Sequence, residues 1–197
     1  MADKPVNVLA VVGSLNRNSV TRAVIHYVAA RLRARGCAVD VLDLQIEPLP
    51  VYSPNRTGDT PGFTALKARV ELADVFLLGT PDYHGGISGA LKNFLDHFWR
   101  EFAGKLFAPV VASHEKGLTA LDQVRTVARQ CYAWAMPYGV SCAEEVQVQD
   151  GRIVGDELMN RLEMLARDIC VYGRLLAQQR RADLADRELG FMACLRA

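Results

Sequence analysis

Hydrophobic runs and helical patterns alternate along the chain. Val6–Val12 is nearly continuous in apolar residues and ends at a glycine, as expected for a strand covered on both faces of a parallel sheet. From Ser19 the apolar positions recur at helical spacing until Gly36, where a helix would end. Ala38–Leu44 then alternates as a second strand. The proline-rich segment that follows, as far as Pro61, predicts a long loop.

The second half of the chain continues this alternation. We expect a helix from Pro61, a strand at Val75–Leu78, a loop at Thr80–Gly89 and a helix with the apolar face Leu91–Phe102. A strand at Pro109–Ala112, a loop at Ser113–Leu118 and a helix from Thr119 to about Trp134 or Met136 follow. The last predicted elements are a strand-like stretch at Val140–Val148, a hairpin turn at Gln149–Gly151 and a long helix capped by Asp156. About five strands therefore alternate with helices.

This order predicts an α/β fold, with a doubly wound, five-stranded parallel sheet and helices on both faces. Ligands of such folds bind beyond the carboxyl ends of the strands, where the strand order reverses. The informative loops are then those after the first, third and fourth strands. They are Gly13–Thr21, Thr80–Gly89 and Ser113–Leu118.

Length and charge narrow the class of protein. The 197 residues suit a single domain over residues 1–197, with a charged tail from about residue 180. The net charge of +1, with no basic run longer than Arg180–Arg181, argues against a nucleic-acid partner. No apolar stretch is long enough to span a membrane, and the first residues do not resemble a signal peptide. We therefore expect a cytoplasmic protein.

The five cysteines are dispersed, with no pair at metal-binding spacing. We expect reduced thiols that act as small buried hydrophobic residues, and no metal site. The positions are Cys37, Cys131, Cys142, Cys170 and Cys194.

The first loop, GSLNRNSVT, offers chemistry suited to one phosphate. It lacks the glycine spacing of dinucleotide-binding and Walker A loops. It does provide hydroxyls, two amides and one arginine just before a helix N-terminus, whose free N–H groups favour an anion. A polar loop that merely caps the helix at Asn18 or Ser19 is the alternative.

The loop after the third strand, GTPDYHGGISG, suits close approach of a flat ligand. Gly85, Gly86 and Gly89 leave little steric bulk, and Tyr83 supplies an aromatic ring. An ordinary glycine-rich surface turn remains the other interpretation.

Together these segments resemble the NADPH-dependent FMN reductase family, whose members are flavodoxin-like. The resemblance is carried by GSLNRNS, by PLPVY, and above all by ADVFLLGTPDYHGGISGALKNFLDHF. The family pattern in the last block is T-P-E-Y-N, followed later by L-K-N, two further residues and an aspartate. Thr80, Pro81, Tyr83 and Asp96 match it, whereas Asp82 and His84 replace the usual Glu and Asn.

The resemblance implies bound FMN, reduced by NADPH or NADH, with electrons passed to a flavin, a quinone, an azo compound or an oxidised metal ion. Hydride chemistry belongs to the flavin, so no catalytic side chain is expected. The phosphate is expected at Ser14, Arg17, Ser19, Val20 and Thr21. The ring system is expected at Pro81, Asp82, Tyr83, His84, Gly85 and Gly86, beside Ser113 and Gly117 of the third loop. Two alternatives are an electron-carrying flavodoxin without a pyridine-nucleotide site and a non-catalytic relative that has lost FMN.

Apolar surfaces also predict a homodimer or homotetramer. The loop Leu49–Tyr52, the aromatic face Phe94–Phe102 and the seam Leu158–Leu176 together exceed what one face of the sheet needs. Members of the family that the sequence resembles are usually dimers or tetramers, which points the same way.

Overall fold

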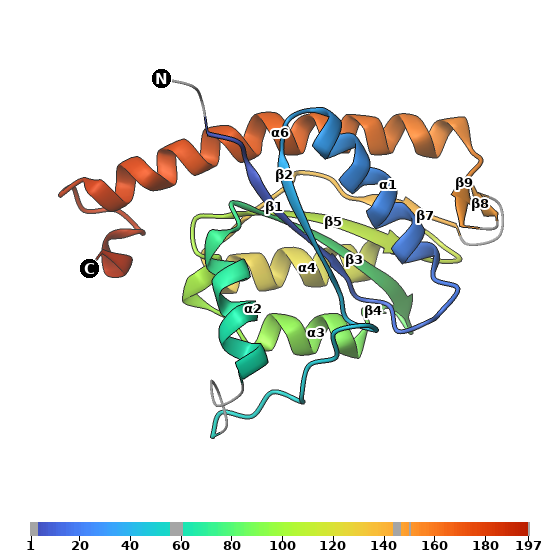
Figure 1. Ribbon diagram of the computed structural model, residues 1–197, viewed down its shortest axis with the longest axis horizontal. Coiled ribbons are helices and arrows are strands. Elements are labelled where there is room, and N and C mark those ends of the chain that lie inside the picture. The colour runs from blue at the N-terminus through green and yellow to red at the C-terminus, as the bar shows by residue number, and fades with distance from the viewer. Residues whose placement is uncertain (1–3, 56–60, 144–146, 150, 197) are drawn as a thin grey trace.

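The computed structural model describes residues 4–55, 61–143, 147–149 and 151–196, and it is built around a parallel sheet (Figure 1). The strand order is β2-β1-β3-β5, and both β6 and β7 pair with the outer edge of β5 at different points along it. The bounds are β1 Asn7–Val12, β2 Ala38–Asp43, β3 Val75–Tyr83, β5 Leu106–Ala112, β6 Trp134–Ala135 and β7 Val140–Cys142. Two short strands thus share the fifth position of the predicted sheet.

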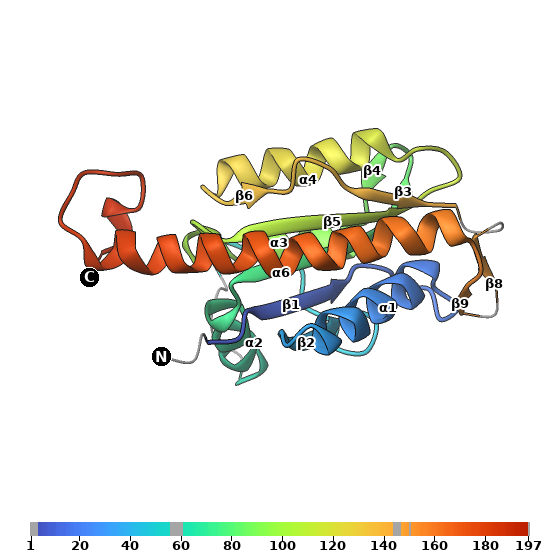
Figure 2. The ribbon, with the colours of Figure 1, turned by 90° about the horizontal axis from the view of Figure 1, so that it is seen from above.

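Helices cover both faces of the sheet, as predicted (Figures 1 and 2). The strand β1 contributes Val8 and Val12 to one core and Leu9 and Val11 to the other. One core lies under α1 (Val20–Ala34) and α6 (Asp156–Ala185). The other lies under α2 (Pro61–Leu72), α3 (Gly89–Asp96) and α4 (Leu118–Gln130).

The third strand is longer than predicted. It continues through Thr80 and Pro81 to Tyr83 because β5 runs beside it, with Pro81 opposite Ala112. The chain then turns back, and β4 (Gly86–Ile87) pairs antiparallel with the end of β3. The predicted loop Thr80–Gly89 is therefore mainly a strand end and a tight hairpin.

Two helix ends also differ from prediction. The aromatic helix stops at Asp96, and Phe102 lies in a separate 3₁₀ turn, η1 (Arg100–Phe102). The helix α4 stops at Gln130 because the chain turns at Tyr132, whose φ is +55°. The Trp134 N–H then donates to the Lys105 carbonyl at 2.8 Å, which brings β6 onto the sheet.

The region before the last helix is confirmed in part. Of the predicted strand Val140–Val148, β7 covers Val140–Cys142, and residues 144–146 lie outside the described residues. The strand β8 (Val148–Gln149) pairs with β9 (Arg152–Ile153) as the expected hairpin, whose residue Asp150 also lies outside the described residues. The helix α6 is preceded by Gly155, which provides no side-chain cap. Asp156 is its first residue rather than its cap.

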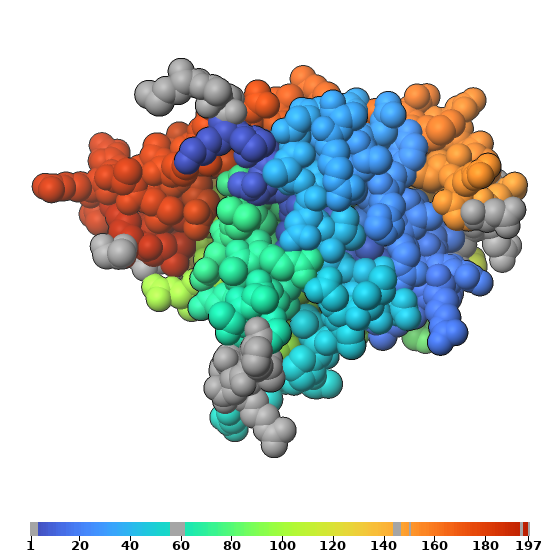
Figure 3. Space-filling model, in the orientation of Figure 1, coloured from blue at the N-terminus to red at the C-terminus, as the bar shows by residue number. Residues whose placement is uncertain are grey.

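The helix α6 is 30 residues long, and its C-terminal part extends beyond the sheet (Figure 2). The C-terminal region protrudes from one side of the molecular surface (Figure 3). Among the described residues, no helix combines the length and the apolar character needed to cross a membrane.

The ends of β1 and β3 approach closely at a pair of glycines. The Gly13 N–H donates to the Gly79 carbonyl at 2.8 Å. A Cβ atom on Gly13 would lie 2.5 Å from the Gly79 carbonyl oxygen and 2.8 Å from the Leu91 Cβ. The carboxyl ends of these two strands can therefore meet only because residue 13 lacks a side chain.

Replacing Gly13 by alanine should lower the free energy of unfolding by about 1–3 kcal/mol, because backbone and core would have to move. Urea unfolding followed by circular dichroism measures this. The matched control is Gly89→Ala, since Gly89 begins α3 and a Cβ there would have no neighbour within 4 Å. We expect that control to match the wild type or to be more stable by up to about 1 kcal/mol. Equal stability of the two variants would contradict the steric argument.

Candidate functional site

The loop after β1 is ordered by its own side chains. Ser19 is the N-cap of α1, and its Oγ accepts the Arg22 N–H at 3.1 Å. Ser14 is buried, and its Oγ accepts the Asn16 N–H at 3.3 Å. Thr21 is buried with its methyl group directed at Gly79. Two of the predicted hydroxyls, those of Ser14 and Ser19, are therefore already used to shape the loop.

The Arg22 side chain of α1 fixes this loop by donating hydrogen bonds to its backbone. Its Nη1 donates to the Asn16 carbonyl at 2.8 Å and to the Arg17 carbonyl at 3.0 Å. Its Nε and Nη2 donate to the two carboxylate oxygens of Asp43, a buried residue at the end of β2. Burial alone would raise the pKa of Asp43, but hydrogen bonds from Arg22 and the Gln45 N–H, with the Arg22 charge, hold it below its ordinary value.

The turn after β3 has an unusual backbone. His84 and Gly85 are consecutive residues with φ of +55° and +78°. Histidine and asparagine are both enriched in this left-handed conformation, which explains how His84 can stand where the related family has Asn. Tyr83, beside the turn, is 54% exposed. The accessible surface of the turn therefore includes backbone atoms and the Tyr83 ring.

The loop after β5 is joined to this turn. The Ser113 hydroxyl donates to Asp82 Oδ2 at 3.0 Å and accepts the Glu115 N–H at 3.2 Å. Gly117 has φ of +59°, and a Cβ there would lie 2.7 Å from the Val111 side chain. Position 117 therefore requires glycine on two counts, and the loop folds back tightly over the end of β5.

Ser88 connects the first loop to the turn after β3, a role that the sequence pattern does not indicate. Its Oγ donates to the Gly13 carbonyl at 2.5 Å and accepts the Leu91 N–H at 3.1 Å. Its own N–H donates to the Thr80 Oγ1 at 2.9 Å. The buried hydroxyl thereby links the end of β1 to the start of α3, and the backbone N–H of the same residue adds a link to β3.

The loop Leu49–Tyr52 is held by α3. The Asn93 side chain accepts the Tyr52 N–H at 2.7 Å and donates to the Pro50 carbonyl at 2.9 Å. A cavity of about 420 Å³ lies between this loop and α3, with Leu15 of the first loop at its edge.

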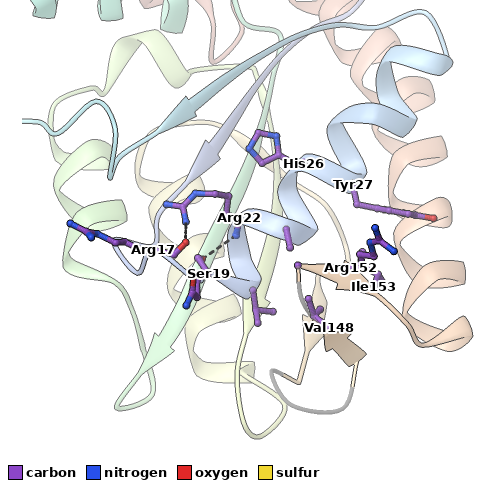
Figure 4. Close-up of a pocket in the computed structure, with 12 residues that line it drawn as sticks. Arg17, Ser19, Arg22, His26, Tyr27, Val148, Arg152 and Ile153 are labelled. Carbon is purple, nitrogen blue, oxygen red and sulfur yellow. Dashed lines mark hydrogen bonds between the residues drawn. The ribbon is translucent and has the colours of Figure 1, made fainter.

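Some of the predicted site residues line two separate cavities, whereas Ser14, Thr21, Pro81, Tyr83 and Gly86 line neither. One, of about 720 Å³, lies at the turn after β3 and the loop after β5, and is lined by Asp82, His84, Gly85, Ser113 and residues 114–119, which include Gly117. The other, of about 1010 Å³, borders the first loop and the hairpin β8–β9, and is lined in part by Arg17, Ser19, Val20, His26 and Arg152 (Figure 4). In Figure 4 the Arg17 side chain points away from the hairpin.

These features fit FMN at its two ends. The first loop has hydroxyls and the first-turn N–H groups of α1 for a phosphate. At the other end, Asp82 Oδ1 is buried and has no hydrogen-bond partner among the described residues. An orphaned carboxylate oxygen beside a glycine turn can accept an N–H donor, which the flavin ring system has on its polar edge.

Sequence comparison supports the same class of protein. The chain is 35% identical over 140 residues to an NADPH azoreductase from Bacillus sp. (strain OY1-2), covering 69% of this chain and 75% of that protein. It is 28% identical over 161 residues to an FMN-dependent NADPH-azoreductase from Staphylococcus haemolyticus (strain JCSC1435), covering 76% and 84%.

Solved structures share the fold. The flavoenzyme NAD(P)H:(acceptor) oxidoreductase from Paracoccus denitrificans has a TM-score of 0.72 at 21% identity, over 85% of this chain and 96% of that chain. An NADH:FMN oxidoreductase has a TM-score of 0.69 at 22% identity, over 86% and 89%.

Fold and site together define a flavodoxin-like oxidoreductase. Residues 6–147 match the NADPH-dependent FMN reductase family, and the chain belongs to that family. It is accordingly an enzyme that uses FMN and NAD(P)H. The family expectation drawn from the sequence motifs is confirmed.

Replacing Asp43 by asparagine should lower the free energy of unfolding at pH 7 by about 1–3 kcal/mol, because a buried charge-assisted pair is broken. The folded pKa of Asp43 lies below its unfolded value, so the stabilisation is present above about pH 4. It is lost as the pH falls through the folded pKa. Wild type and variant should therefore converge in stability in strong acid, as denaturant unfolding across a pH series would measure.

Asp96→Asn serves as the control for this experiment. Asp96 pairs with Lys92 on an exposed face of α3, where such pairs contribute less than about 1 kcal/mol. A pH-independent loss in the Asp43 variant, or an equal loss in the control, would refute the assignment.

Proposed function

We propose that this enzyme passes electrons from NADPH, through bound FMN, to azo compounds or quinones. The observation that carries the proposal is the glycine-lined cavity at the turn after β3 and the loop after β5, in a chain whose named relatives are azoreductases. We choose NADPH rather than NADH as the proposed donor because the names of those relatives specify NADPH. A small-molecule acceptor, rather than a protein or nucleic acid, suits a cavity of this size.

The proposal assigns the two ends of FMN to the two sets of predicted residues. Ser14, Ser19 and the N–H groups of Val20 and Thr21 would hold the phosphate, together with the exposed Arg17. The turn residues Pro81, Asp82, Tyr83, His84, Gly85 and Gly86, with Ser113 and Gly117, would hold the ring.

FMN, when bound, supplies the two-electron chemistry. The protein's part is to position the ring and leave one face open to the donor. The left-handed turn at His84 and Gly85 does this with backbone, because neither a Cβ nor a long side chain projects from residue 85. No described side chain is therefore assigned as an acid or base.

Anaerobic mixing with NADPH, followed by addition of an azo dye or a quinone, tests the function. The purified protein should contain FMN, lose its yellow colour with NADPH, and regain it when the acceptor is added. Colour loss without recovery by either acceptor would contradict the acceptor class. Purification with stoichiometric FMN that NADPH does not reduce would contradict the proposed activity itself.

Gly85→Val should slow reduction of the flavin by about 100-fold, because valine is strained at positive φ and its methyl groups would displace the ring or the donor. His84→Asn keeps a residue that accepts this backbone and should reduce at close to the wild-type rate. Stopped-flow bleaching measures both rates, after FMN content has been determined for each variant. Wild-type speed in Gly85→Val with complete loss in His84→Asn would mean that side-chain chemistry controls the step.

We also propose a homodimer or homotetramer, on grounds that differ in part from those the sequence suggested. Of the three predicted surfaces, the loop Leu49–Tyr52 still exposes Val51. Phe94, Phe98 and Phe102 are buried in the core, and the seam of α6 packs on the sheet, so neither is a spare surface. The outer face of α6 instead exposes a row of apolar side chains, at Met164, Val171, Tyr172 and Leu175. A second copy covering that row would remove it from water.

Sedimentation equilibrium at micromolar concentration should give two or four chain masses. Leu175→Glu places a charge in the exposed row and should shift the mass towards one chain. Leu72→Glu, at a comparably exposed leucine on α2, is the control. A wild-type mass of one chain would overturn the assembly.

A cytoplasmic location completes the proposal. It is supported by the state of Cys37, Cys131, Cys142 and Cys170, which are unbridged thiols of the kind that a reducing compartment maintains.

A further inference from the structure

Two of the buried cysteines lie against each other. Cys37 follows the turn between α1 and β2, and Cys170 lies midway along α6. Their Sγ atoms are 3.0 Å apart, although the residues are separated by 133 positions in the chain. Both residues are at the border between buried and accessible, each with 9% of its surface exposed. The sulfur atoms would have to approach by about 1 Å to reach the length of a disulfide bond.

The surroundings of the pair are fixed by a second contact between the same elements. Glu163 of α6 forms ion pairs with Arg31 and Arg35 of α1, and it accepts the Tyr27 hydroxyl at 3.2 Å. This cluster lies about two helical turns before Cys170. The helix α6 is thus already held in register against α1, and the two sulfur atoms are held in register with it.

We propose that Cys37 and Cys170 are a redox-modification site, at which a peroxide converts the two thiols to a disulfide that fastens α6 to the corner between α1 and β2. Nothing in the FMN chemistry requires this pair. Cys37 lies just before the amino end of β2, whereas the glycine turn follows the carboxyl end of β3 in the same parallel sheet. Cys131 belongs to the core on the other face of the sheet, and Cys142 lies in β7, at the edge of the sheet opposite β2.

The reaction has two balanced steps. The Cys170 thiolate attacks one oxygen of hydrogen peroxide, so that an S–O bond forms, the O–O bond breaks and hydroxide leaves to become water. The Cys37 sulfur then attacks the Cys170 sulfur, so that the S–S bond forms and a second water leaves with the Cys37 proton. Overall, two thiols lose two electrons and two protons, and one peroxide becomes two waters.

Electrostatics favours Cys170 as the first thiolate. The hydrogen bond from Cys37, together with the charges of Arg35 and Arg174, lowers the pKa of Cys170 to about 7 against the effect of burial. The same contact, with burial, raises the pKa of Cys37. Cys170 is then the attacking group and Cys37 the resolving one, which is the arrangement that converts a sulfenic acid quickly into a disulfide.

Peptide mapping of the wild-type holoenzyme tests the site. The protein is treated with hydrogen peroxide, its remaining thiols are alkylated, and it is digested without reductant. We expect a linked peptide pair containing Cys37 and Cys170, two fewer free thiols, and full reversal by dithiothreitol. The linked form should unfold about 5–15 °C higher than the reduced form, because the bond closes a long loop.

Matched variants separate this pair from general oxidation. Cys170→Ser should remove the link and the stabilisation, whereas Cys131→Ser, at another buried thiol, should keep both. Sulfinic acid on Cys170 without a linked peptide, or a link through other cysteines, would overturn the proposal. So would a Cys37–Cys170 bond that does not raise the unfolding midpoint. The peptide map of the wild type decides even if the serine variant does not fold.

Discussion

The hydrogen bond from the Ser88 hydroxyl to the Gly13 carbonyl is the contact around which the site is arranged. It lies where the strand order reverses between β1 and β3, the place where ligands of doubly wound sheets bind. Because the same hydroxyl caps α3, the end of β1 and the turn after β3 cannot shift independently. The short distance from Gly13 to Gly79 leaves no room for a side chain between them. Two loops separated by about 70 residues therefore behave as one rigid surface.

Charged side chains also hold the loops of the site in place. Arg22 lies one turn into α1, yet it joins the carbonyls of the preceding loop to a carboxylate at the end of β2. On the other side, Asp82 uses one oxygen to hold Ser113 and leaves the other buried and, among the described residues, unpaired. A buried polar atom without a partner is costly, so it is usually found where a ligand supplies the missing group. The first carboxylate serves the fold, and the second is available to a cofactor.

Much of this molecule could be predicted from its sequence, because the pattern is local where the structure is regular. Val6–Val12 is apolar on both faces, and such a run has few alternatives to a central parallel strand. The end of α4 could not be predicted, because Trp134 leaves the helical pattern only to pair with β5. The same holds for the site. Its glycines and hydroxyl-bearing residues could be predicted from the sequence of the loops. The hydrogen bonds of Arg22 and Ser88 could not, because each is made to a residue far away in the chain.

The hydrogen bonds that Arg22 and Ser19 make within the first loop also affect the conformational entropy of cofactor binding. Ordering the backbone of one residue costs about 1–2 kcal/mol of conformational entropy. If the loop were disordered before binding, this cost would fall on the binding step and weaken the affinity for the cofactor. Here Arg22 and the Ser19 cap impose that order during folding. Under the proposed assignment, an incoming phosphate would meet a loop whose backbone is already ordered, so association would need no prior search among loop conformations. Apoprotein and holoprotein would then differ little in backbone structure at this end, and the rate of uptake would be set by diffusion into the cleft.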